Sequence, residues 1–172
     1  MAIRSIIVAP DPRLKAKSEA VGTVDEGLRR LMNDMRETMY AAAGIGLAAI
    51  QIGVPKQVIV IDLSAPKDPE PLYLVNPKIV DASEATVSQE EGCLSLPSQY
   101  AEVKRHETIE VAYLDYWGKP QTLKAEGMLA ICIQHEMDHL KGVLFVDRIS
   151  ALKRNMILRR LSKQKKLQPV AS

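Results

Sequence analysis

The chain has 172 residues and a mass of 19.0 kDa, which suffices for one domain with a hydrophobic core and not for two large ones. Apolar residues make up 47% and aromatic residues 4%, so the core must be aliphatic and a stacking platform for single-stranded nucleic acid is disfavoured. The longest apolar run is far short of the ~18 residues of a membrane span, and neither a secretory signal nor a transit segment is recognisable. Because two cysteines cannot form a disulfide framework, we expect a cytoplasmic protein.

The net charge of +2 hides an asymmetry along the chain. From Arg148 to the end there are eight basic residues and no acidic ones, which leaves 15 basic and 21 acidic residues before it. A basic C-terminal segment that follows an acidic remainder of the chain indicates a charged partner.

The first third of the chain predicts one helix. The stretch up to Val24 contains two prolines and Gly22, and we expect a short strand followed by irregular chain. Residues 25–43 carry apolar side chains at the spacing of one buried helical face, and we expect this helix to end at Gly44. These apolar residues are Leu28, Leu31, Met32, Met35 and Met39.

The middle of the chain is rich in predicted strands. We expect strands at residues 57–63, 72–80 and 107–114. Residues 117–119 are expected to form the turn of a hairpin that continues into residues 121–124. Pro77 makes the strand at residues 72–80 an edge strand or a bent one. Residues 64–71, with three prolines, are expected to form a loop.

Two helices are predicted near the C-terminus. Residues 125–141 are apolar nearly all round from 128 to 133, which indicates a buried helix that ends at Gly142. A further helix is expected after Ser150, with Leu152, Met156 and Leu161 on one side. Together the elements predict an α+β domain in which antiparallel strands pack around the central helix, followed by a C-terminal helix.

The most informative motif is His135-Glu136-Met137-Asp138-His139 on the predicted central helix. An HExxH pattern places two imidazoles one turn apart, where both can reach one metal ion, and the glutamate stands near the metal-bound water. A chance pair of histidines on a solvated face is the alternative. Burial of His and Glu without a partner would be costly, so the apolar helix favours a metal site.

The third ligand is less obvious. Phe145 stands where a metzincin would have its third histidine, and Asp147 is poorly spaced for a downstream carboxylate ligand. Cys132 sits among Leu and Ile residues, as expected of a small buried hydrophobe. Cys93 lies among turn-forming residues before a break at Pro97, so a loop can aim its thiolate at the metal. A Cys, two His and a water suit Fe(II), Zn(II) or Co(II), with Glu136 as general base and acid.

The segment GIGLAAIQIG, residues 44–53, is the second unusual stretch. It lacks the context of a dinucleotide-binding motif, and a helix end followed by a close-packed loop would explain its glycines. Gln51 is a polar amide in an apolar setting and needs partners. Its amide nitrogen could donate to an oxyanion.

Three segments in this order, GIGLAAIQIG, EGCLSLP and QHEMDHLKGVLFVDR, resemble the signature motifs of bacterial peptide deformylases, and PDPRLK near the start resembles the family's opening. The resemblance implies a hydrolase that removes the N-formyl group from the N-terminal formylmethionine of nascent proteins and releases formate. It implies one divalent metal ion, usually Fe(II), with Zn(II), Ni(II) or Co(II) as alternatives. On this basis residues 1–148 are one catalytic domain, and residues 149–172 are a basic helix and tail.

The resemblance also implies a role for individual residues. The metal ligands are Cys93, His135 and His139, and Glu136 is the general acid and base. Gln51 and the backbone N–H of Leu94 stabilise the oxyanion. Backbone groups around Ile45, Gly46 and the loop before Cys93 pair with an extended substrate peptide. An apolar pocket takes the methionine side chain, and helix spacing predicts that Leu129 lines it.

The resemblance further implies that the C-terminal helix docks on the ribosome, although a helix that only keeps the protein soluble is an alternative. The candidate phosphate contacts are Arg154, Arg159, Arg160, Lys163, Lys165 and Lys166. Two other functions remain open on the residues alone. One is a related metallohydrolase, such as an aminopeptidase-like enzyme. The other is a structural zinc protein that binds RNA, for which Glu136 would have no task and a fourth ligand is missing.

Overall fold

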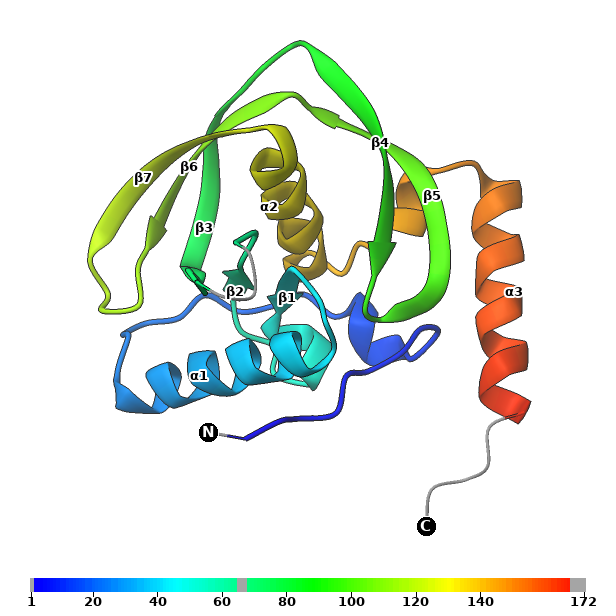
Figure 1. Ribbon diagram of the computed structural model, residues 1–172, viewed down its shortest axis with the longest axis horizontal. Helices are drawn as coiled ribbons and strands as arrows, with labels where there is room; N and C mark the ends of the chain where they lie inside the picture. The colour runs from blue at the N-terminus through cyan, green and yellow to red at the C-terminus, as the bar shows by residue number, and fades with distance from the viewer. Residues whose placement is uncertain (1, 65–67, 168–172) are drawn as a thin grey trace.

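The computed structural model describes residues 2–64 and 68–167 (Figure 1). Part of the predicted loop 64–71 and the last residues of the basic tail lie outside this range. The helices are α1 (Glu26–Ala41), α2 (Gly127–Leu140) and α3 (Ala151–Leu167), with 3-10 turns η1 (Pro12–Lys15), η2 (Ala49–Ile52) and η3 (Phe145–Arg148). The strands are β1 (Gly46–Ala48), β2 (Val58–Ile61), β3 (Leu72–Ala82), β4 (Thr86–Cys93), β5 (Leu96–His106), β6 (Thr108–Leu114) and β7 (Pro120–Glu126).

Helix α2 lies between two antiparallel sheets. One sheet has five strands in the order β1-β2-β3-β6-β7, and the other is the β4–β5 hairpin. In Figure 1 the long strands curve around α2, while α1 lies below the five-stranded sheet and α3 stands outside the hairpin. The predicted class, α+β with antiparallel strands around a central helix, is confirmed. None of the described helices combines the length and the apolar character that a membrane span requires.

Strand β2 contributes side chains to two hydrophobic clusters, one on each face of the sheet. Side chains alternate between the two faces of a strand. Ile59 and Ile61 pack with α2, and Val58 and Val60 pack with α1. All four residues are buried, since helices cover both faces. This explains why residues 57–63 read as a continuous apolar run rather than an alternating one.

Strand β3 is bent at Pro77 but is not an edge strand. It pairs with β2 on one side and β6 on the other, and its register with β6 shifts between Val75 and Lys78. The irregularity accommodates a residue that has no N–H to donate. Of the two predicted alternatives, the bent strand is therefore the correct one.

The β4–β5 hairpin was not predicted, and it changes the setting of Cys93. Cys93 is the last residue of β4 rather than part of a loop, and Pro97 lies inside β5 rather than breaking it. The N-terminal stretch also differs from expectation. Instead of a strand it is irregular chain with η1, joined to the rest by Ile7 N–H to Gln51 O and Ala9 N–H to Ser95 O hydrogen bonds.

Helix α1 ends at Ala41, two residues earlier than expected. Ala43 adopts the left-handed conformation, with φ of 55°, and the amides of Ala43 and Gly44 bond to the carbonyls of Tyr40 and Met39. This is the Schellman arrangement with alanine in the usual glycine position. Gly44 serves a different purpose, because a Cβ there would lie 2.6 Å from Cδ1 of Leu94.

The C-terminal end of α2 and the start of α3 are as predicted, whereas α2 begins at Gly127 rather than at residue 125 and the buried face of α3 differs from the predicted one. Gly142 follows α2 with φ of 74°, and Ser150 caps α3 by accepting from the amide of Lys153. Leu161 is buried with Ile157 in a cluster that contains Phe145, whereas the predicted Leu152 and Met156 are exposed. The helix therefore packs through a narrow stripe that contains Ile157 and Leu161, and of the three predicted residues Leu161 alone is buried.

Candidate metal centre and active site

Helix α2 presents His135 and His139 on one face. The two residues are four apart, so their rings lie one turn from each other, with centroids 5.2 Å apart. Both side chains are buried. The predicted helical pair therefore faces the interior rather than solvent.

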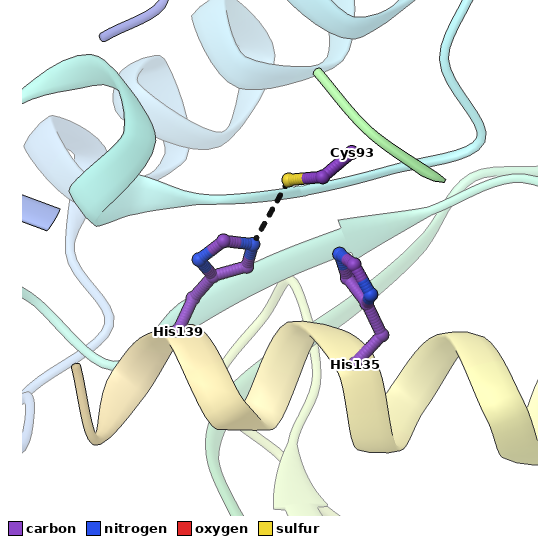
Figure 2. Close-up of side chains that lie close together, drawn as sticks. All are labelled: Cys93, His135 and His139. Atoms are coloured by element: carbon purple, nitrogen blue, oxygen red, sulfur yellow. Dashed lines mark hydrogen bonds between the residues drawn. The ribbon is translucent and has the colours of Figure 1, made fainter. Parts of the chain in front are cut away.

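Cys93 meets this pair from the opposite sheet. Its Sγ lies 3.4 Å from Nε2 of His139, and the ligand atoms of Cys93, His135 and His139 all lie within 4.8 Å of one another (Figure 2). The close-up shows both imidazoles rising from α2 toward the sulfur. A thiolate and two imidazoles in this arrangement can bind one divalent transition-metal ion.

The other ring nitrogen of His135 is held by a carboxylate. Nδ1 of His135 lies 2.9 Å from Oε1 of Glu91, which fixes Nδ1 as the protonated nitrogen and leaves Nε2 free to bind a metal. Burial opposes the charge on Glu91, but the hydrogen bonds from Arg105 and His135 outweigh it and lower the pKa of Glu91 to about 2. Glu91 is therefore a carboxylate at neutral pH.

A chain of buried charges extends from Glu91. Arg105 donates Nε and Nη2 to Glu91 and Nη1 to Asp138, at 2.9, 2.8 and 2.6 Å. Arg148 then donates Nε and Nη2 to Asp138 at 2.5 and 2.7 Å. These four residues were missed from the sequence as parts of the site. Glu91 lies inside the EGCLSLP motif, and Asp138 and Arg148 lie inside QHEMDHLKGVLFVDR, which was the available signal.

Glu136 lies beside the candidate metal ligands in a tightly enclosed position. Its Oε1 is 3.9 Å from Nε2 of His135, and its Oε2 is buried with no hydrogen-bond partner among the described residues. Burial raises the pKa of Glu136 to about 7. A Cβ on Gly46 would lie 2.8 Å from Oε1, so glycine is needed where β1 passes the carboxylate. An unpartnered carboxylate at this pKa is suited to exchanging a proton with a ligand.

Gln51 has the partners that its burial requires. Its Oε1 accepts from the backbone amide of Ala48 at 2.9 Å, and its Nε2 lies 3.0 Å from Oγ of Ser95 and 3.5 Å from Sγ of Cys93. The bond to Ala48 fixes which end of the amide faces the sulfur. The amide N–H groups of Gln51 therefore point toward the space beside Cys93.

A cavity of about 420 Å³ opens onto this constellation. Met128, Ile131 and Cys132 of α2 form its apolar part. Leu129, which helix spacing had suggested for this wall, instead packs on the core around β2. The cavity is also lined by Ile45, Gly46, Cys93, Leu94, His135 and Glu136.

The remaining ligand candidates of the sequence lie elsewhere. Cys132 is buried, and burial raises its pKa to about 12, so it stays a neutral thiol as expected of a core residue. His106 is exposed, with Nδ1 near the carbonyl of Ser83. Asp147 pairs with Lys15 and Arg154 and takes no part in the site.

The donor set fits a resident metal ion. Sulfur and two imidazoles converge, one imidazole has its second nitrogen fixed by a carboxylate, and the buried carboxyl group of Glu136 lies beside them. This combination of an HExxH helix, a third protein ligand and an adjoining cavity defines the metal-dependent hydrolases.

The comparisons identify the family within this class. A model of the polypeptide deformylase family matches residues 3–155. The chain is 57% identical to a peptide deformylase of Pelagibacter ubique and 54% identical to one of Rhizobium meliloti, each over 96% of both chains. The crystal structure of a peptide deformylase from Ehrlichia chaffeensis superposes with a TM-score of 0.92 at 40% identity, covering 98% of this chain and 100% of that one. A structure from the same organism in complex with actinonin gives a TM-score of 0.93 at 42% identity, over 96% and 99%.

The chain belongs to the polypeptide deformylase family. It is a metal-dependent hydrolase that removes the N-formyl group from the N-terminal formylmethionine of nascent proteins and releases formate.

Proposed function

We propose that Cys93, His135 and His139 hold the catalytic ion, that this ion is Fe(II), and that deformylation takes place in the adjoining cavity. The convergence of the three ligand atoms within 4.8 Å of one another, beside Glu136, is the observation that carries the proposal. When bound, the ion acidifies water and polarises the formyl carbonyl. Metal analysis after purification without oxygen distinguishes iron from zinc, nickel and cobalt.

Glu136 accepts a proton from the attacking water and returns it to the amine that leaves. Its buried, unpartnered Oε2 supports this role, because no protein group competes for that oxygen among the described residues. Gln51 and the backbone N–H of Leu94 donate to the oxyanion that develops at the formyl carbon. Both residues adjoin Cys93, one through a 3.5 Å contact and one as its neighbour in the chain.

The substrate binds as an extended strand along Ile45 and Gly46, and its methionine side chain enters the apolar part of the cavity. Among the described strands, β1 pairs with β2 alone, so it is at the edge of its sheet. Strand β4 likewise pairs with β5 alone within the described residues, so it too has a free edge. Gly46 and Gly92, one from each strand, both line the cavity. A peptide between them can pair through its backbone, which is recognition by strand addition.

The deciding experiment measures release of free amine from a short N-formylmethionyl peptide by protein purified without oxygen. The N-acetyl peptide and the unblocked peptide serve as controls. We expect turnover of the formyl peptide alone. An enzyme that cleaves peptides with a free amino terminus is an aminopeptidase instead. Metal-loaded protein that leaves the formyl peptide intact would contradict the proposed assignment of the site.

Replacement of Gln51 by alanine is expected to lower kcat about 10²- to 10³-fold, because one preorganised oxyanion donor is lost. KM should change little if the amide acts mainly in the transition state. Steady-state kinetics with the formyl peptide provide the measurement. Since Gln51 also bonds to Ser95, the Ser95→Ala variant controls for loss of packing and should retain most of the activity. Equal losses in the two variants would assign Gln51 a structural role.

We also propose a cytoplasmic enzyme in which residues 1–148 form the catalytic domain and α3 docks on the ribosome. Seven of the exposed or half-buried side chains of α3 are basic and none is acidic. They are Lys153, Arg154, Arg159, Arg160, Lys163, Lys165 and Lys166. Ile157 and Leu161 are buried against the rest of the protein, so removal of the whole helix would expose core. Charge reversal on its exposed face is the cleaner test.

The variant with Arg159, Lys163 and Lys166 changed to glutamate is expected to lose ribosome affinity and to keep full turnover of a short formyl peptide. Loss of about three phosphate contacts should reduce the slope of log K against log salt by about 2 to 3. Sedimentation with ribosomes at several salt concentrations measures both quantities. A matched variant reverses Lys56, Lys78 and Lys119 and should bind normally. Unchanged affinity of the α3 variant would remove the docking proposal.

A further inference from the structure

The two faces of the β4–β5 hairpin carry different chemistry. Glu91 faces α2, where it holds His135. Glu90 and Gly92 alternate with it and therefore lie on the other face. Across the hairpin, Glu90 is directly opposite Glu102, and Gly92 is directly opposite Tyr100. This second face carries no known part of the reaction, yet Glu90, Gly92 and Tyr100 all line the active-site cavity.

The ring of Tyr100 lies beside Gly92 of β4. A Cβ added to Gly92 would lie 2.7 Å from Cε1 and 2.8 Å from Cδ1 of the Tyr100 ring, so the ring covers the position where a side chain would stand. The tyrosine is nevertheless 62% exposed. Gly92 thus allows an aromatic ring from β5 to lie over β4, with most of its surface available to a ligand.

Glu90 and Glu102 form an uncompensated pair. Both are exposed, and like charges directly opposite each other in a sheet are unfavourable. Within the described part of the chain, neither carboxylate has an ion pair. Lys104 is the next residue on this face, but it lies opposite Ser88, one pair further from the cavity. The described residues that line the cavity include three glutamates and no lysine or arginine.

The side chains of a bound, extended peptide point alternately to opposite sides, and this determines which of them reaches the face that carries Glu90. In the proposed binding mode the methionine side chain enters the apolar part of the cavity beside Ile131 and Cys132 of α2, the helix that Glu91 also faces. In an extended peptide the next side chain points the opposite way. It therefore points to the face that carries Glu90, Tyr100 and Glu102.

We propose that this face selects a basic residue immediately after the formylmethionine, with the Glu90–Glu102 pair attracting the cation and the Tyr100 ring covering its stem. The inference rests on the proposed binding of the substrate along β1 and β4. A lysine or arginine relieves the repulsion between the two carboxylates and can place its charge over the aromatic ring. An acidic residue at the same position adds a third negative charge.

The test compares kcat/KM for three formyl peptides that differ only after methionine, with lysine, norleucine or glutamate. Norleucine keeps most of the apolar stem of lysine without its charge. At low salt we expect lysine to exceed norleucine about three- to tenfold, and glutamate to fall below it by a similar factor. The differences should shrink at high salt. Moving lysine and norleucine one position further along the peptide should abolish the difference, because that side chain points to the other face.

The double variant Glu90→Gln and Glu102→Gln should lose the difference between lysine and norleucine. A matched double variant, Glu84→Gln and Glu107→Gln, removes two exposed carboxylates outside the cavity and should keep it. Equal kcat/KM for the three peptides, or a lysine preference that survives the first double variant, overturns the inference while leaving the deformylase assignment intact. Failure of every formyl peptide to react would instead contradict the proposed site and this inference together.

Discussion

Replacement of Glu136 by glutamine is expected to lower kcat for a formyl peptide about 10²- to 10⁴-fold, while the protein still binds one metal ion. Glutamine has nearly the same volume, so it fits the close approach of Gly46 but cannot accept a proton from water. Cys93, His135 and His139 are unchanged. Single-turnover kinetics and metal analysis of the same preparation measure the two properties separately.

Two outcomes would contradict this role for Glu136. Activity within tenfold of the unsubstituted enzyme would show that another group exchanges the proton. Loss of metal together with activity would assign Glu136 to the stability of the site. The Met137→Leu variant is a suitable control, because it changes the adjacent buried residue of α2 without altering charge, and it should remain active.

Replacement of Arg105 by methionine is expected to lower the free energy of unfolding by about 3–5 kcal/mol. Arg105 is 2% exposed and pairs with Glu91 and Asp138, whose side chains are 5% and 8% exposed. Methionine fills much of the volume but leaves two buried carboxylates without their shared partner. Since total stability is typically about 5–15 kcal/mol, the loss is a large fraction of it. Urea unfolding at fixed metal saturation measures the change.

Arg30 provides the matched control for this experiment. It is 72% exposed and lies 3.7 Å from Glu26, one turn away on α1. An exposed pair of this kind contributes about 0–1 kcal/mol, so Arg30→Met should be nearly neutral. Similar effects of the two substitutions would show that His135 and Arg148 are sufficient partners for Glu91 and Asp138 without Arg105. Metal affinity should fall only in the Arg105 variant, because Glu91 then loses the group that fixes it beside His135.

The parts of the fold that follow simple hydrophobic patterns could be predicted. Helix α1, strand β2 and the buried helix α2 each carry a regular apolar face or run. The β4–β5 hairpin could not, because its inner face holds Glu91 and Arg105 where an ordinary strand would have apolar residues. Their mutual pairing makes this burial possible, and such pairing between distant residues is not visible in local sequence. The buried stripe of α3 was misplaced because Leu152 and Met156 remain exposed.

The convergence of the candidate metal ligands could be predicted from the sequence, but the buried residues that hold them in place could not. HExxH has a fixed geometry on a helix, so His135, Glu136 and His139 follow from spacing alone. Cys93 was inferred by elimination and by resemblance, without knowledge of the strand that presents it. The Arg105–Asp138–Arg148 connection joins β5, α2 and η3, and no spacing rule links those segments. The role of Gly46 likewise appears only when β1 is seen beside Glu136.

The proposed metal ligands come from separate parts of the chain, and this has a consequence for how the protein folds. Cys93 and His139 are 46 residues apart, and Arg105 lies 33 residues from Asp138. Contacts of such sequence separation require loop closure and form slowly compared with helices. The helical pair alone can offer two nitrogens, but the third ligand arrives only when the hairpin closes on α2. Tight metal binding therefore reports that the chain has completed its tertiary structure, and the rate of metal uptake during refolding follows the closing of the hairpin.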